Sequence, residues 1–193
     1  AVASVDNNYN MVPTPNAQAL GNGGMPIDLR PKAVPDGDRI IVGLIDTAVQ
    51  AKGSGIPDFL LPGISVAGDA QSSDASPTHG TSMAESILRG ASSDGATDSR
   101  VRILSVDVYG NNANTTTFDV AAGITKAVNS GAMIINLSLG SDGSSALLQQ
   151  IIQDAHKQGV VFLASAGNEP VTTPTYPAAY PEVVAVTAVG KNM

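Results

Sequence analysis

The sequence predicts a doubly wound α/β fold built on a mostly parallel β-sheet. Five short apolar runs rich in β-branched residues have the pattern of strands buried on both faces, and they lie at 40–46, 102–108, 132–137, 160–165 and 183–189. Helical patterns separate several of these runs, and strands alternating with helices favour parallel pairing through crossover connections. Apolar residues make up 42% of the chain and aromatic residues only 4%, which favours close packing of helices on a sheet.

The helices are predicted from apolar stripes with helical spacing. One stripe comprises Val120, Ala121, Ile124, Ala127 and Val128. A second stripe, which Gly159 ends, comprises Leu147, Leu148, Ile151, Ile152 and Ala155. A shorter helix is predicted from about Thr81 to Arg89.

Residues 1–38 differ from the rest of the chain, because they are rich in Pro, Asn, Gly and Asp and show no sustained hydrophobic period. They are expected to form an extended N-terminal arm over the surface of a domain at 39–193. The first ten residues lack the basic start and apolar core of a signal peptide. No apolar run approaches the roughly 20 residues that a membrane-spanning helix needs.

The composition excludes several classes of function. The formal net charge is −7, and an acidic balance argues against a nucleic-acid partner, whose binding depends on clustered Lys and Arg. Cysteine is absent, which removes disulfides, thiolate metal sites and a Cys nucleophile. A nucleotide-binding α/β domain is disfavoured, since the glycines at 21–24 precede the first predicted strand of the sheet.

Three polar side chains lie where strands end or helices begin. Asp46 follows the first apolar run, His79 precedes a predicted helix, and Asn168 follows the fourth run. Ligands of parallel sheets bind beyond the carboxyl ends of the strands. An acid, an imidazole and an amide at that edge could orient a base, transfer a proton and stabilise a developing oxyanion.

Each of these residues also has a purely structural interpretation when it is taken alone. Asp46 could cap a helix or turn, His79 could be a polar residue at a helix start, and Asn168 could form a turn after Gly167. The other histidine, His156, is interpreted as a solvated residue at a helix C-terminus.

Taken together, these motifs resemble the subtilisin-like serine proteases, or subtilases. The strand into Asp46-Thr47 looks like the family's Asp motif, and His79-Gly80-Thr81 looks like its His motif. Further segments similar to the family in order and spacing are Ile135 to Gly140, Ala164 to Glu169, Tyr176 to Pro181 and Val183 to Val186. Two departures are Ala48, where Gly is usual, and Ser82, where a second His is common.

The resemblance implies a role for each matching residue. Asp46 would orient His79, His79 would accept and return the proton of a serine nucleophile, and Asn168 with a backbone N–H would stabilise the oxyanion. An extended peptide substrate would bind in a cleft. One wall of this cleft would consist of Ser138, Leu139, Gly140, Ala166 and Gly167, and Asn114 would lie on the opposite wall.

The nucleophile itself is not evident in these 193 residues. The family's nucleophilic Ser lies well beyond the Asn, and none of the residues after Asn168 is Ser. Gly80 to Ala84 spells the family's nucleophile motif, Gly-Thr-Ser-Met-Ala. Ser82 is nevertheless rejected as the nucleophile. Its segment matches the His motif, and a Ser one helical turn after His79 is badly placed to face the imidazole across a substrate carbonyl. Residues 39–193 are therefore expected to be the N-terminal two-thirds of a subtilase-like catalytic domain.

The resemblance also sets expectations about partners and location. The expected partners are a polypeptide substrate or an inhibitory propeptide, and a C-terminal fragment carrying the Ser. The expected location is secreted or extracytoplasmic. The chemistry needs no metal or organic cofactor, although structural calcium is common in the family. Asp94 and Asp98 could supply oxygen ligands, but their spacing matches no known pattern of a calcium site. The alternative function is a non-catalytic subtilase-like module that binds peptide or a partner chain.

Overall fold

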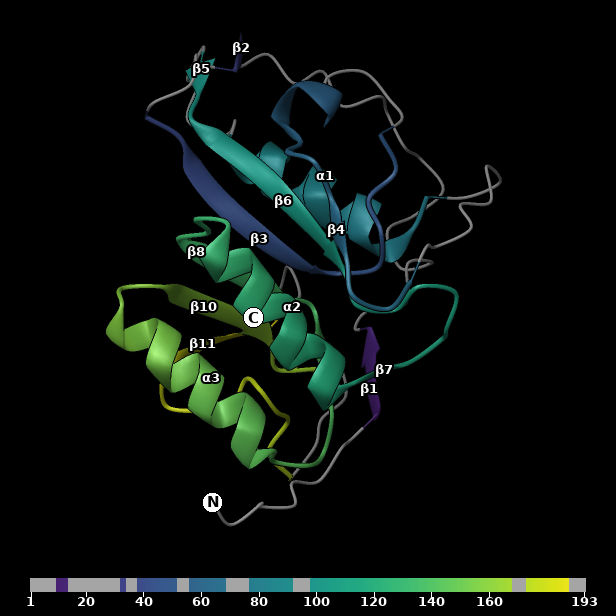
Figure 1. The fold of residues 1–193 in the computed structure, drawn as a ribbon, viewed down its shortest axis with the longest axis vertical. Helices are drawn as coiled ribbons and strands as arrows, with labels where there is room; N and C mark the ends of the chain where they lie inside the picture. Colours follow the sequence, from purple (N-terminus) through teal and green to yellow (C-terminus); the bar gives the residue numbers. More distant parts are fainter. Residues whose placement is uncertain are drawn as a thin grey trace, which may run out of the picture.

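The computed structural model describes residues 10–13, 32–33, 38–51, 56–68, 77–91, 98–167 and 173–187. Six strands of this part form one sheet, in the order β11-β10-β8-β3-β6-β4, and every pair in it is parallel (Figure 1). The strands are β3 (Ile40–Asp46), β4 (Ile64–Ser65), β6 (Val101–Asp107), β8 (Ile134–Leu137), β10 (Val161–Ser165) and β11 (Val183–Val186). The doubly wound parallel fold is confirmed.

Smaller elements surround this sheet. A three-stranded sheet has the order β7-β1-β9, with β1 (Asn10–Pro13) between β7 (Thr115–Thr116) and β9 (Leu139–Gly140). A short pair joins β2 (Lys32–Ala33) to β5 (Asp98–Ser99). The helices are η2 (Ile56–Phe59), α1 (His79–Ala91), α2 (Thr117–Asn129) and α3 (Ala146–Lys157).

The helices cover both faces of the sheet. In Figure 1, α2 and α3 lie side by side in front of the strands, whereas α1 lies behind β3 and β6. The front core includes Ile45, Ile124 and Phe162, and the core behind includes Leu44 and Leu88. Adjacent residues of β3 thus face opposite cores, as the two-residue period of a strand requires.

The sequence located these elements to within a few residues. The five predicted strands are β3, β6, β8, β10 and β11, and the two apolar stripes lie on α2 and α3. The shorter predicted helix begins two residues earlier than expected, at His79. Thr78 accounts for the earlier start, because its hydroxyl accepts a hydrogen bond from the Thr81 N–H, as a helix N-cap does.

One face of the sheet carries exposed valines. Phe162 and Ala164 of β10 are buried in the front core, so the alternate residues of that strand point to the back. Val161, Val184 and Val186 on β10 and β11 are 46%, 54% and 48% exposed. The back of the sheet is therefore covered by α1 near β3 and β6 but remains partly open at β10 and β11.

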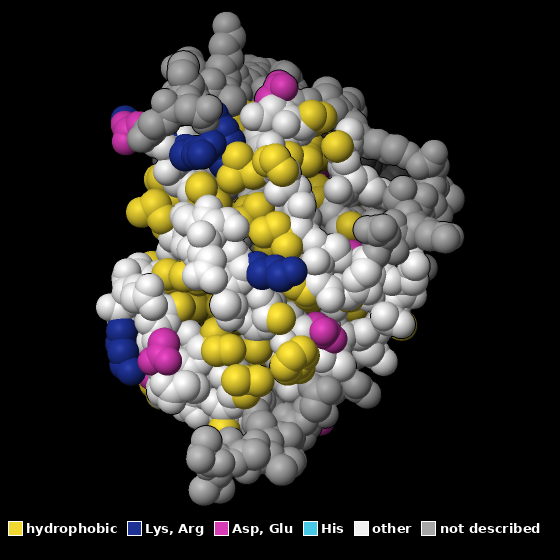
Figure 2. Space-filling view, viewed as in Figure 1, with side chains coloured by type: hydrophobic (Ala, Val, Ile, Leu, Met, Phe, Trp, Pro, Cys, Tyr) yellow, Lys and Arg dark blue, Asp and Glu magenta, His cyan; other side chains and the backbone are white. Residues whose placement is uncertain are grey.

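Positively charged side chains are scattered on one face of the molecule. On the face drawn in Figure 2, the Lys and Arg side chains are dispersed and form no single basic patch. Within the described ranges, no helix is long and apolar enough to cross a membrane.

Candidate active site

Asp46 and His79 form a buried pair at the carboxyl end of the sheet. Asp46 is the last residue of β3 and is 1% exposed, and His79 is the first residue of α1 and is 8% exposed. The His79 Nδ1 atom lies 2.8 Å from Asp46 Oδ1 and 2.9 Å from Asp46 Oδ2. Because an ionised carboxylate only accepts hydrogen bonds, the proton of a neutral His79 ring is on Nδ1.

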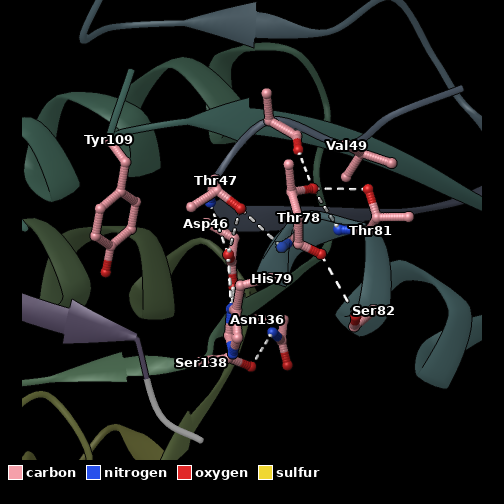
Figure 3. A network of polar contacts seen from close by, with 12 residues as sticks. Asp46, Thr47, Val49, Thr78, His79, Thr81, Ser82, Tyr109, Asn136 and Ser138 are labelled. Carbon is pink, nitrogen blue, oxygen red and sulfur yellow. Dashed lines mark hydrogen bonds and ion pairs between the residues drawn. The ribbon is translucent and has the colours of Figure 1, made fainter. Parts of the chain in front are cut away.

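Backbone groups hold the two elements together. Asp46 Oδ1 accepts a 2.7 Å hydrogen bond from the Thr47 N–H, which fixes the carboxylate (Figure 3). The Thr47 hydroxyl oxygen accepts a 2.8 Å bond from the Gly80 N–H in the first turn of α1. Thr47, which follows Asp46, is thereby bonded to Gly80, which follows His79.

The second nitrogen of His79 is available for proton transfer. Nε2 is buried and has no hydrogen-bond partner among the described residues. Ser82 does not supply one, because its hydroxyl donates a 3.4 Å hydrogen bond to the carbonyl oxygen of Thr78, the residue just before α1. An Nε2 atom that carries no proton can act as a general base toward a hydroxyl brought within reach.

Asn136 and Ser138 flank Leu137, which pairs with Ile45 directly before Asp46. Asn136 is on β8, and Ser138 is the single residue between β8 and β9. The Asn136 Nδ2 atom donates a 2.9 Å hydrogen bond to the Ser138 hydroxyl oxygen. This contact fixes the start of the segment that the sequence assigned to substrate binding.

The expected peptide cleft is occupied by the chain itself. Strand β1 pairs antiparallel with β7, with Met11 opposite Thr115, and antiparallel with β9, with Val12 opposite Gly140 and Pro13 opposite Leu139. The Met11 side chain is fully buried, within the core that contains Leu139. A segment of the predicted surface arm therefore lies as the central strand between the two predicted cleft walls.

The remaining predicted site residues are placed to different extents. Asn114 is exposed and directly precedes β7, so the strand pairing on that wall is made by Thr115 and Thr116. Ala166 and Gly167 follow β10 at the carboxyl edge of the sheet, and Gly167 has a φ of 93°. Asn168 lies outside the described residues, so its role stays a prediction.

Tyr109 contributes a buried phenol near the pair. It is 1% exposed, and its hydroxyl has no partner within the described ranges. Burial raises the pKa of the Tyr109 phenol well above its ordinary value, and the negative charge of Asp46 adds to the rise. The turn that carries it is fixed by Asp107, whose Oδ1 accepts 2.9 Å hydrogen bonds from the Tyr109 and Gly110 N–H groups.

The described residues contain no cluster of acidic, His or Cys side chains. No group of three or more His, Cys, Asp or Glu side chains in that part of the chain could hold a metal ion. Asp94 and the side chain of Asp98, the two acidic residues named above in connection with calcium, lie outside the part of the chain that the structure describes.

The sequence matches a known protein family. The sequence profile of the Subtilase family matches residues 37–193. The chain belongs to the subtilase family. It is 34% identical over 167 residues to thermitase from Thermoactinomyces vulgaris, covering 82% of this chain and 58% of thermitase. It is 31% identical over 163 residues to subtilisin DY from Bacillus licheniformis, covering 81% of this chain and 58% of that protein.

A solved structure shows the same likeness in three dimensions. The subtilase chain superposes on a mutant of the protease domain of PatA with a TM-score of 0.67 and 30% sequence identity, covering 79% of this chain and 58% of that one. The chain thus spans little more than half the length of the relatives it matches. The fold around Asp46 and His79 is that of a serine-protease family.

Sequence reasoning missed Met11, which lies between the two predicted cleft walls, and the residues that hold the start of α1 to the segment after β3. Met11 lies in an arm without hydrophobic periodicity, and only the apolar neighbours Met11-Val12 in a polar segment could have drawn attention to it. Thr78 and Gln50, which connect α1 to the segment after β3, carry no sequence signal, because polar residues are ordinary at helix starts and in loops.

Proposed function

We propose that this subtilase domain hydrolyses peptide bonds in extended polypeptides. Asp46 and His79 act as the orienting acid and the proton-transferring base, and Asn168 with a backbone N–H stabilises the oxyanion. The Ser nucleophile is supplied by a segment outside these 193 residues, either in a longer chain or as a separate fragment. The observation that supports this most directly is the buried Asp46–His79 contact, in which Nε2 has no partner among the described residues.

The geometry suits the two proton transfers of acyl transfer. With its proton on Nδ1 and directed at Asp46, His79 presents the lone pair of Nε2 to an incoming Ser hydroxyl. As that hydroxyl attacks the substrate carbonyl, its proton moves to Nε2, and the Asp46 carboxylate stabilises the imidazolium. The same proton then passes from Nε2 to the leaving amine. No metal or organic cofactor takes part in these steps.

The substrate class follows from the way β1 binds. Strand β1 pairs with β7 and with β9 through main-chain groups, so another extended peptide could take the place of β1 with little demand on its sequence. In this proposal β1 acts as an inhibitory, propeptide-like segment, and a substrate strand binds only after β1 has left. The fully buried Met11 side chain would be the main apolar anchor of the inhibitory strand.

Binding tests the cleft directly. A variant lacking residues 1–13 should bind a synthetic peptide of residues 8–15 saturably, as measured by isothermal titration calorimetry, and the whole chain should bind it far more weakly. A peptide with Met11→Asp is the matched control and should lose most of the affinity, since burying an unpaired carboxylate is costly. Equal binding of both peptides would contradict occupation of the cleft by this strand.

Hydrolysis tests the chemistry. Residues 39–187 fused to the C-terminal third of thermitase should cleave a fluorogenic extended peptide. His79→Ala and Asp46→Asn should each lower kcat/KM by at least about 10²-fold, whereas His156→Ala should not. Cleavage that survives His79→Ala in a folded fusion would refute the assigned base.

The chain of 193 residues should by itself be a poor hydrolase, because Nε2 has no hydroxyl partner in the described part of the site. Incubation of the pure chain with casein should give no cleavage above the blank. Robust cleavage that Ser82→Ala abolishes would overturn this expectation and make Ser82 the nucleophile.

A non-catalytic peptide-binding module is less well supported. Strand pairing alone could bind a peptide, but it would not require a buried carboxylate within 2.8 Å of a buried imidazole. A secreted location and structural calcium are also proposed from the family resemblance. Calcium is tested by whether a chelator lowers the Tm of the chain.

A further inference from the structure

We propose that Thr78 is a positioning residue for the His79–Asp46 pair. Its hydroxyl group closes a hydrogen-bond chain that ties the start of α1 to the segment after β3. The proposal rests on the function above, because it takes this pair as the proton-transfer unit. It assigns Thr78 a task beyond capping the helix.

The donors and acceptors of this chain have a fixed direction. The Thr78 Oγ1 atom lies 2.6 Å from the Ala48 carbonyl oxygen, and a carbonyl can only accept, so the Thr78 hydroxyl proton is used there. The 2.7 Å contact between the two hydroxyls must therefore be donated by Thr81 to Thr78. Thr81 Oγ1 in turn accepts a 2.9 Å hydrogen bond from the Gln50 N–H.

These contacts use the full capacity of the Thr78 hydroxyl. Besides its one donated bond, Thr78 Oγ1 accepts from the Thr81 hydroxyl and, at 3.1 Å, from the Thr81 N–H. The Thr78 N–H adds a 3.3 Å bond to Gln50 Oε1 (Figure 3 shows the network around Thr78). The direction of the chain is thus Gln50 N–H to Thr81, Thr81 to Thr78, and Thr78 to the Ala48 carbonyl.

The placement of these bonds explains why they bear on His79. The two chain neighbours of His79 are Thr78 and Gly80, and each bonds to one of the two residues that follow Asp46. Thr78 bonds to Ala48, and Gly80 bonds to Thr47. The residues on both sides of His79 are therefore fixed to the two residues that follow Asp46, each through a bond between a Thr hydroxyl and a backbone group, and this sets the approach of Nδ1 to Asp46.

Capping and positioning make different predictions for substitutions. Thr78→Val keeps the shape but removes both the cap and the donation to Ala48, whereas Thr78→Ser retains both. Thr116 provides a matched control, because its hydroxyl caps α2 by accepting from the Asp119 N–H and lies on another helix. Thr116→Val should therefore weaken a helix cap without affecting the pair.

The experiment measures the pair directly in the whole 193-residue chain. Proton NMR follows the hydrogen on His79 Nδ1, and amide hydrogen exchange follows the Gln50 N–H. Thr78→Val should make both hydrogens exchange about tenfold faster or more, as loss of an intramolecular hydrogen bond allows. Thr78→Ser should keep both within about twofold of the unsubstituted chain, and Thr116→Val should leave them unchanged.

Two results would overturn the proposal. One is a folded Thr78→Val chain in which both hydrogens exchange at the original rates. The other is a Thr116→Val chain that loses both signals equally, which would mark a general loss of stability. If Thr78→Val does not fold, Thr81→Val breaks the same chain at its other hydroxyl and is judged by the same two rates. These rates do not depend on cleavage, so failure of the hydrolysis test and failure of this proposal are distinguishable.

Discussion

Gly80 approaches Thr47 so closely that a Cβ atom on Gly80 would lie 2.1 Å from the Thr47 carbonyl oxygen. Real Cβ atoms do not come that near to a backbone oxygen, so any side chain at this position would push α1 away from the end of β3. The same two residues share the hydrogen bond from the Gly80 N–H to the Thr47 hydroxyl oxygen. The space between them is what lets His79 reach Asp46.

Gly80→Ala should therefore destabilise the chain by about 1–3 kcal/mol or more, because the added methyl group overpacks a backbone contact. The free energy of unfolding is obtained from urea denaturation. Gly90→Ala in the same helix is the matched control, since nothing lies within 4 Å of a Cβ there. It should stabilise α1 by up to about 1 kcal/mol. Equal effects at the two glycines would contradict the steric argument.

Met11→Ala should lower the free energy of unfolding by about 2–5 kcal/mol, because a fully buried Met side chain is removed from the core. Phe118→Ala is the control, as Phe118 is 62% exposed, and it should change stability by less than about 0.5 kcal/mol. Denaturation of both variants in urea gives the comparison. An unchanged Met11→Ala chain would mean that β1 adds little to the stability of the domain.

The raised pKa of Tyr109 has a consequence at alkaline pH. The unfolded chain releases the phenol proton near pH 10, whereas the folded chain retains it, so the titration of Tyr109 leaves the free energy of unfolding unchanged below pH 10 and lowers it as the pH rises further. Tyr109→Phe removes this pH dependence. Unfolding free energies measured at pH 8 and pH 11 should therefore differ less in the variant than in the unsubstituted chain.

The hydroxyl groups of Tyr109 and Tyr180 should differ in their effect on stability at neutral pH. Tyr109→Phe removes a hydroxyl without a partner among the described residues and should be neutral or stabilising. Tyr180→Phe should destabilise by about 1–3 kcal/mol, because its hydroxyl accepts from the Ser145 N–H and donates to the Ser145 carbonyl, both at 3.0 Å. The opposite order would refute the assigned contacts.

The exposed valines on β10 and β11 should make the chain of 193 residues self-associate or bind an apolar partner. Size-exclusion chromatography with light scattering and the fluorescence of an apolar dye measure this. Changing Val184 and Val186 together to Thr should reduce both signals, whereas Met133→Thr, at another exposed apolar site, should reduce them less. A monomer of 19.5 kDa that binds no dye would contradict the prediction.

The sequence by itself determined the sheet and the main pair of the candidate site. Strands buried on both faces need continuous apolar runs, and helices packed on a sheet need apolar stripes, so β3, β8, α2 and α3 could be located from local pattern alone. Asp46 was singled out because it ends a buried strand at the edge where parallel sheets bind ligands, His79 because it begins a helix, and the resemblance of their motifs to the subtilases joined them.

Tertiary structure alone decided where β1 lies and how the Asp46–His79 pair is held. Met11 lies 104 positions from its partner Thr115, and no periodicity of the arm encodes a pairing made by backbone groups. The same holds for Thr78, whose bond to the Ala48 carbonyl spans 30 residues and exists only once α1 has packed on β3. Local pattern specifies which side chains are buried, whereas contacts between backbone groups distant in sequence depend on the assembled fold.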